Sequence, residues 1–128
     1  MPKYIIDSYA WIEYFKDSEK GRKAARILDS TENELFTPIV IIAEVCSLFQ
    51  REGRDPLLAY EHIISLSTPL PFSAEFARDV GVLHGAIKLK IKDFGLVDAF
   101  VLFAAKKFGA KILTGDLHFK GFKEAVLI

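Results

Sequence analysis

Short apolar runs of strand length alternate with longer segments of helical spacing along the 128-residue chain. Strands are predicted for KYII, ELFTP, TPLPF, AKILTGD and EAVLI, at 3–6, 34–38, 68–72, 110–116 and 124–128. Helices are predicted over 9–16, 19–29, 38–52, 55–67, 73–89 and 96–109. This alternation is typical of an α/β fold, a three-layer sandwich with a central, mainly parallel sheet flanked by helices.

Local signals set several of the predicted helix ends. Thr37 is the predicted N-cap of the helix that begins at Pro38, and Gly53 closes that helix. Asp55 before Pro56 opens the next helix, and Gly109 follows a helix whose last turn carries two lysines. Ligands of parallel α/β sheets collect at the carboxyl ends of the strands. Residues just past the strand ends are therefore the first place to look for a site.

The composition indicates one globular domain, residues 1–128. The chain is 51% hydrophobic and 27% charged, with no linker, repeat or low-complexity tract. No apolar stretch is long enough to span a membrane, and MPKY does not resemble a signal peptide. One cysteine, Cys46, excludes an internal disulfide, so a cytoplasmic location is expected.

The net charge of zero argues against a generic basic nucleic-acid binder. The charge is nevertheless uneven, because residues 86–128 contain eight lysines and four acids. If some of those acids bind a metal ion, the remaining surface of this region is more positive than the total suggests.

A single acid interrupts each of the four most apolar stretches. These acids are Asp7 in YIIDSYAWI, Glu44 in PIVIIAEVCSLF, Asp98 in FGLVDAFVLFAA and Asp116 in KILTGDLHF. A buried carboxylate without a partner costs several kcal/mol, and no Lys or Arg lies inside these runs. A divalent cation would remove the mutual repulsion of four acids in one pocket. Hard oxygen ligands indicate Mg²⁺ or Mn²⁺ rather than zinc.

Each acid taken alone also has a purely structural explanation. Asp7 could cap the following helix, Asp98 lies in a first helical turn, and Asp116 could be a turn residue. Glu44 lies in mid-helix between apolar neighbours, where only an ion pair would serve. The set of four is therefore more informative than any single member.

These motifs resemble the PIN-domain ribonucleases, and especially the VapC-type toxins of toxin–antitoxin pairs. The resemblance covers essentially the whole chain and rests on YIIDSYAWIEYF, on Glu44 in IIAEV and on GLVDAFVLFAAKKFGAKILTGDLHF. It implies a PIN fold and metal-dependent cleavage of RNA, with 5′-phosphate products. The residues that match the family's acidic metal site are Asp7, Glu44, Asp98 and Asp116, while Ser8 and Thr114 match supporting positions.

The resemblance has two departures and several further implications. Family members often carry another acid two residues after the last one, where this chain has His118. The first basic residue after Glu44 is Arg51, whereas some relatives place one closer.

The family also implies a homodimer and a small antitoxin that blocks the acidic groove. Either Glu44 or Asp98 is the candidate general base.

Contact with RNA requires positive charge near the acidic pocket. The candidates are Lys88, Lys90, Lys92, Lys120 and Lys123, with His118 as a possible phosphate contact. Taken singly, each of them fits a solvated surface better than an RNA contact.

Two other functions compete with the nuclease. One is a PIN-like module that binds RNA or protein without catalysis. The other is a magnesium-dependent phosphotransfer protein, such as a receiver domain. Receivers need an adjacent acidic pair after the first strand, and haloacid-dehalogenase-like phosphatases need Asp-x-Asp; here Asp7 is followed by Ser8 and Tyr9.

Overall fold

One sheet contains five strands: β1 (Lys3–Ile6), β2 (Glu34–Pro38), β3 (Thr68–Leu70), β4 (Lys111–Thr114) and β5 (Ala125–Leu127). The computed structural model describes residues 1–128. All neighbouring strands are parallel, in the order β3-β2-β1-β4-β5. The predicted sheet is therefore confirmed, and β1, the first strand of the chain, lies at its centre.

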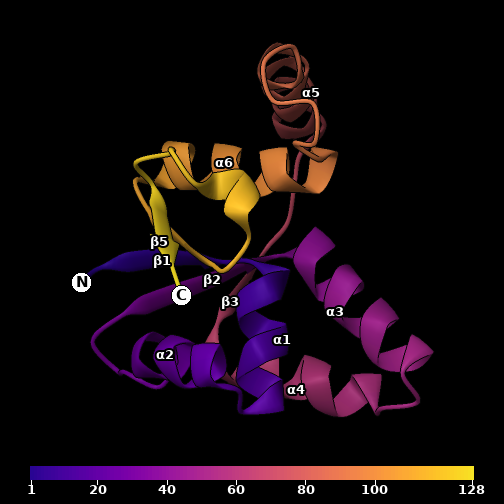
Figure 1. Cartoon of the computed structure of the whole chain (residues 1–128), viewed down its shortest axis with the longest axis vertical. Coiled ribbons are helices and arrows are strands. Elements are labelled where there is room, and N and C mark those ends of the chain that lie inside the picture. The colour runs from indigo at the N-terminus through magenta and orange to yellow at the C-terminus, as the bar shows by residue number, and fades with distance from the viewer.

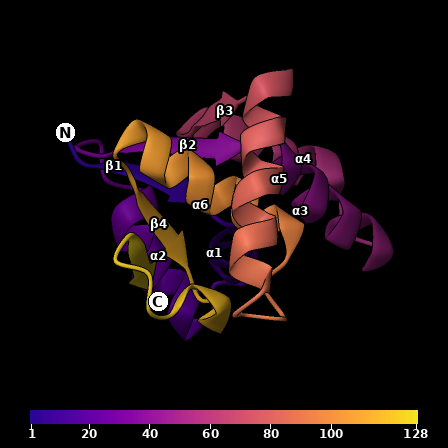
Figure 2. The same cartoon turned by 90° about the horizontal axis from the view of Figure 1, so that it is seen from above.

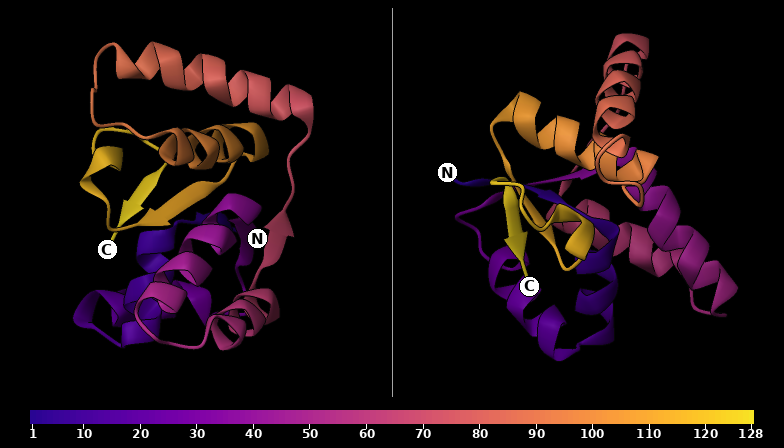
Figure 3. Two further views of the ribbon diagram at one scale, coloured as in Figure 1. Left: turned by 90° about the vertical axis from the view of Figure 1, so that its right-hand side faces the viewer. Right: turned by 45° about the horizontal axis from the view of Figure 1, so that its top comes forward.

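Six helices surround the sheet: α1 (Ser8–Lys16), α2 (Glu19–Leu28), α3 (Ile39–Arg51), α4 (Pro56–Leu66), α5 (Ala74–Lys88) and α6 (Leu96–Phe108). Helices α1 to α4 lie on one side of the sheet and α6 lies on the other (Figures 1 and 3). Figure 2 shows α5 crossing α6 on its outer side, where Phe72, Phe76 and Phe100 stack together. The three-layer sandwich is thus the observed architecture. None of these helices combines the length and apolar character that crossing a membrane requires.

The central strands β1 and β4 are apolar after an exposed lysine at the start of each, because helices cover both faces of the sheet. Ile5 and Ile6 of β1 and Ile112 and Leu113 of β4 are fully buried. They belong to a single core cluster that also includes residues of α1, α3 and α6. The core therefore holds the carboxyl ends of β1 and β4 rigidly side by side.

Thr37 does not cap α3, contrary to the prediction. It lies in β2, fully buried, and Pro38 occupies the N-cap position instead. The Trp11 indole N–H donates to Thr37 Oγ1 at 3.1 Å, and Thr37 Oγ1 lies 2.7 Å from Ser67 Oγ. Ser67 Oγ in turn donates to the carbonyl of Ile63. The hydroxyl is therefore used in a buried chain of hydrogen bonds that links α1, β2 and α4.

Replacing Thr37 by Val is expected to lower the free energy of unfolding by about 1–3 kcal/mol, because it leaves the buried Trp11 indole N–H without a partner and removes the hydrogen bond between Thr37 and Ser67. The change keeps the side-chain shape and suits a strand, so cavity formation contributes little. Urea titration measures the effect. Thr68→Val, at an exposed strand position, is the matched control. Equal unfolding midpoints for the two variants would contradict the role assigned to the buried chain.

Candidate active site

The strand order of the sheet reverses at β1. β1 pairs with β2 on one side and with β4 on the other. Crevices at such switch points, outside the carboxyl ends of the strands, are the usual ligand sites of open α/β sheets. Asp7 follows β1 directly, and Asp116 lies two residues beyond β4. The two acids that sequence analysis placed at strand ends therefore lie at the same edge of the sheet.

Asp7 is the most buried acid of the four, with 4% of its surface exposed. It occupies the N-cap position of α1, but its carboxylate makes no capping hydrogen bond. Instead, Oδ2 accepts a 2.8 Å hydrogen bond from Thr114 Oγ1, across 107 residues of sequence. Burial raises the pKa of Asp7 to about 7, and the charges of Asp98 and Glu44 act in the same direction. Thr114, which the resemblance gives as a supporting residue, thus forms a direct hydrogen bond with Asp7.

Asp98 points into the same edge from the first turn of α6. Its Oδ2 accepts a 2.9 Å hydrogen bond from the backbone N–H of Gly95, the residue at the N-cap. Asp98 therefore stabilises the start of its own helix, as an acid in a first helical turn commonly does. However, the same oxygen also lies 3.1 Å from His118 Nδ1, so the carboxylate faces the other acids as well as its own helix.

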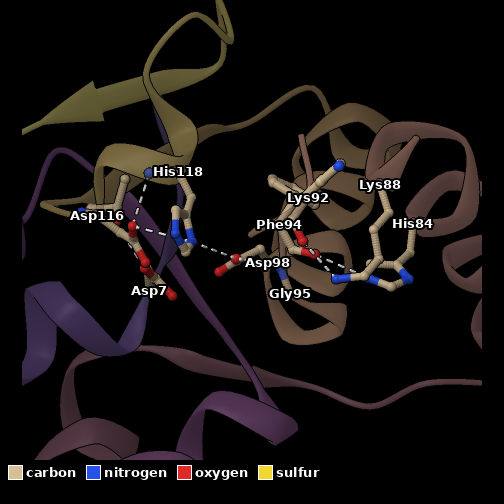
Figure 4. Close-up of polar contacts among 10 residues, drawn as sticks. Asp7, His84, Lys88, Lys92, Phe94, Gly95, Asp98, Asp116 and His118 are labelled. Carbon is tan, nitrogen blue, oxygen red and sulfur yellow. Dashed lines mark hydrogen bonds and ion pairs between the residues drawn. The ribbon is translucent and has the colours of Figure 1, made fainter. Parts of the chain in front are cut away.

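His118 joins Asp98 to Asp116, as Figure 4 shows. It lies in the short 3-10 helix η1 (Leu117–Phe119), and its Nδ1 is 3.5 Å from Asp116 Oδ1. The hydrogen bond to Asp98 raises the pKa of His118 above its usual value, and the Asp116 charge adds to the effect. Sequence analysis noted His118 at a position where relatives often carry a further acid and as a possible phosphate contact, but its place between Asp98 and Asp116 was missed.

Glu44 lies at the rim of the site, exposed, in the second turn of α3. Partial desolvation raises its pKa, the Ser8 hydroxyl opposes the shift, and the charges of Asp98 and Asp116 raise the pKa further. Ser8 and Glu44 line one groove of about 600 Å³ between α1 and α3. The groove continues past Ile12 and Leu48 to Arg51, which is the nearest basic residue after Glu44 along the chain.

The PIN domain family profile matches residues 4–125 of the chain. The chain belongs to the PIN domain family. Among solved structures, the chain is similar to DNA-bound VapBC from Salmonella typhimurium, with a TM-score of 0.73, 18% identity and coverage of 100% of this chain and 98% of that one. It is also similar to the sarcin–ricin loop-cleaving toxin VapC20 from Mycobacterium tuberculosis, with a TM-score of 0.73, 16% identity and coverage of 94% and 97%.

A toxin–antitoxin complex from Klebsiella pneumoniae shares the fold as well, with a TM-score of 0.71, 20% identity and coverage of 96% and 95%. A search of curated protein sequences gave no significant match. The family assignment removes the receiver and phosphatase alternatives, because the PIN domain profile covers residues 4–125 of the chain.

The acidic residues of this PIN domain suit a divalent cation. Asp7 is buried, faces the charges of Asp98 and Glu44, and forms no ion pair with a lysine or arginine. Ligand atoms of Asp98, Asp116 and His118 all lie within 4.8 Å of one another. Carboxylate oxygens are hard ligands, and a bound cation would offset their mutual repulsion. The site of this PIN domain therefore fits a metal ion, with Asp7 as its buried wall.

The lysines predicted to contact RNA lie beside this edge but not within it. Lys88 Nζ donates to the backbone carbonyl of Lys92 at 2.8 Å, which holds the loop between α5 and α6. Figure 4 shows Lys88 and Lys92 on the far side of Gly95 from the acids. Lys90 and Lys120 are exposed, the latter directly after η1. The basic residues therefore flank the acidic edge of the PIN domain on two sides.

Proposed function

We propose that this chain is a metal-dependent endoribonuclease and the toxin of a toxin–antitoxin pair. The observation that carries the proposal is the convergence of Asp98 and Asp116, whose ligand atoms lie within 4.8 Å of each other, at the sheet edge where buried Asp7 lies and where Glu44 occupies the rim. The four acids come from four separate segments, and each feels the charge of at least one other. Hydrogen bonds to nearby backbone N–H groups give Asp98 and Asp116 each a local structural role. These local roles do not explain this convergence.

In this proposal Asp7, Asp98 and Asp116 hold Mg²⁺ or Mn²⁺. A divalent ion at such a site lowers the pKa of bound water and neutralises charge on the phosphate oxygens. Thr114 fixes the orientation of Asp7 through its hydroxyl, and the same oxygen accepts the backbone N–H of Asp116 at 3.0 Å. One threonine therefore holds two of the acids in register with each other.

Glu44 is the better of the two candidates for the general base. One oxygen of Asp98 is already shared between the Gly95 N–H and His118. Glu44 is exposed at the rim and has a raised pKa, so it can accept a proton from water that approaches along the groove. In-line attack by water would leave a 5′ phosphate on the product. Ser8, which lies beside Glu44, would orient this carboxylate.

The substrate is RNA, held along the phosphate backbone by Lys88, Lys90, Lys92 and Lys120, which flank the acidic edge. His118 lies close enough to the acids to influence the scissile phosphate. Because lysines contact phosphates without reading bases, these contacts supply affinity rather than choice of sequence.

The protein partner is an antitoxin that covers the groove between α1 and α3. The groove combines apolar walls, including Ile12 and Leu48, with the carboxylate of Glu44 at one end. An apolar segment that carries a basic residue would match both features. Solved toxin–antitoxin complexes share this fold. Leu57, Leu58 and Ile64 of α4 are exposed apolar side chains, and they support a homodimer. We also propose that the protein is cytoplasmic.

The test is cleavage of end-labelled single-stranded RNA and of a structured RNA by the purified chain without antitoxin. We expect cleavage with Mn²⁺ or Mg²⁺, none with EDTA, and 5′-phosphate ends. Asp98→Asn should reduce the rate at least about 100-fold, since several kcal/mol of charge stabilisation depend on the metal. Asparagine can still accept from Gly95, so the start of α6 is kept.

The matched control is Asp79→Asn, at an acid of α5 whose ion pair with Arg78 lies on the surface. It should cleave at the wild-type rate. A chain that cleaves neither RNA with either metal, and whose melting temperature does not rise with metal, would rule out the nuclease. A chain that binds RNA without cleaving it would instead support the non-catalytic PIN-like module.

A further inference from the structure

The ring of His118 occupies a position that a surface histidine does not normally take. Nδ1 lies 3.1 Å from Asp98 Oδ2 and 3.5 Å from Asp116 Oδ1, between carboxylates of two separate elements. Two ligands that occupy adjacent positions on one octahedral ion are about 3 Å apart, because each lies about 2.1 Å from the metal. His118 Nδ1 therefore lies at about the spacing of a neighbouring ligand from each of these two carboxylate oxygens.

The backbone holds His118 in this place. The His118 N–H donates to Asp116 Oδ1 at 2.9 Å, and Asp116 itself is tied to Thr114. The next residue, Phe119, is fully buried and contacts the Phe94 ring, with 5.9 Å between the ring centroids. Phe94 directly precedes Gly95, whose N–H holds Asp98. The Phe119–Phe94 contact thus joins the segment that carries His118 to the segment that holds Asp98. Core packing therefore fixes the position of the His118 backbone relative to Asp98.

A separate observation indicates that a cation belongs at this edge. Asp7 is 4% exposed and lies near Asp98 and Glu44, and its carboxylate accepts one side-chain hydrogen bond, from Thr114. No lysine or arginine pairs with it. A buried carboxylate of this kind needs compensating charge that the protein itself does not provide.

We propose that His118, once its Nδ1 has released to solvent the proton that it donates to Asp98, is a direct ligand of the divalent cation through this nitrogen, and that it makes the site prefer Mn²⁺ to Mg²⁺. This inference rests on the proposed metal-dependent nuclease. An imidazole nitrogen binds transition metals well, whereas Mg²⁺ strongly favours oxygen ligands. A neutral ring in place of a further carboxylate also lowers the negative charge that attracts Mg²⁺. One nitrogen among oxygen ligands therefore shifts metal preference without altering the acids.

Pulsed electron paramagnetic resonance on the Mn²⁺-loaded full chain tests the inference, because echo modulation detects ¹⁴N bonded to Mn²⁺. We expect directly coordinated nitrogen in the wild type and in His84→Gln, and none in His118→Gln. The chain has only three histidines, and His84 serves as control because its ring bonds the Phe94 carbonyl on the outer side of the loop. His62→Gln is a second control, because His62 lies on α4 and its ring contacts the Tyr14 hydroxyl of α1.

Titration calorimetry supplies an independent measure. His118→Asp should lower the ratio of Mn²⁺ to Mg²⁺ affinity at least about tenfold, because it replaces nitrogen with oxygen. Bound Mn²⁺ without nitrogen coupling in the wild type would overturn the inference, and continued RNA cleavage by the same sample would leave the proposed function intact. Absence of both Mn²⁺ binding and cleavage would overturn both. The wild-type spectrum is decisive even if a His118 variant does not fold.

Discussion

Asp7→Asn is expected to stabilise the metal-free protein at pH 8 and, at the same time, to abolish RNA cleavage. In the folded chain the pKa of Asp7 is raised to about 7, mainly by burial, from an ordinary value of 3.8. Between about pH 4 and pH 7 the folded state holds a proton that the unfolded state has lost. The free energy of unfolding therefore falls as pH rises through this window and stays low above it.

The size of the effect follows from the shift in pKa. About three pH units correspond to roughly 4 kcal/mol, which is an upper limit because the chain can relax around the charge. We expect asparagine, which carries no charge, to add about 2–4 kcal/mol at pH 8 and little at pH 4. The amide oxygen of the new side chain can still accept from Thr114, so the hydrogen bond across the sheet survives.

Urea unfolding in EDTA at pH 4 and pH 8, beside a cleavage assay, measures both effects. Asp17→Asn is the matched control, because Asp17 is exposed and forms only a long surface ion pair with Arg22. Its stability should change by less than about 0.5 kcal/mol at either pH. Equal stability of Asp7→Asn and wild type at pH 8 would show that the Asp7 charge is compensated in some other way.

Gly21→Ala is expected to lower the free energy of unfolding by about 3 kcal/mol or more. Gly21 lies in the first turn of α2, where the helix crosses the end of α1. A Cβ at this position would overlap the Glu13 carbonyl oxygen and lie 2.6 Å from its carbon. Backbone atoms cannot rotate away as a side chain can, so α1 and α2 would have to separate. Since α1 begins directly after Asp7, cleavage activity should fall with stability.

Gly81→Ala is the control for Gly21→Ala. Gly81 is also in a helix, in the middle of α5, but a Cβ there meets nothing within 4 Å. Higher helix propensity should leave this variant unchanged or up to about 1 kcal/mol more stable. Thermal melts of the two variants measure the contrast. Similar losses at both positions would mean that the close contact between α1 and α2 is less rigid than described.

Local patterns predicted most of the elements because the signals that end them are local. Asp55 and Pro56 open α4, with two backbone N–H groups bonded to the aspartate, and Gly109 ends α6 in the left-handed conformation at φ 63°. The four acids could be selected because a lone charge in an apolar run is costly wherever the run lies. These inferences need no knowledge of tertiary contacts.

The parts that sequence analysis missed depend on distant partners. Thr37 is a residue type that often caps helices, but its hydroxyl is hydrogen-bonded to Trp11 and Ser67 instead. His118 meets Asp98 across 20 residues, and no spacing rule links them. The groove between α1 and α3 likewise exists only once the two helices are packed. Tertiary contacts thus overrode local propensity where buried polar groups had to find partners.

The position of β1 in the middle of the sheet has a consequence for synthesis on the ribosome. The chain emerges with β1 and β2 first, but β1 acquires its second neighbour only when β4, residues 111–114, is available. Asp7 and Thr114 are then joined across 107 residues of sequence. Such late, long-range pairing slows folding and makes it depend on nearly the whole chain. A growing chain that ends before β4 would therefore lack the assembled site, so the proposed RNA cleavage could begin only after residues 111–114 have been made.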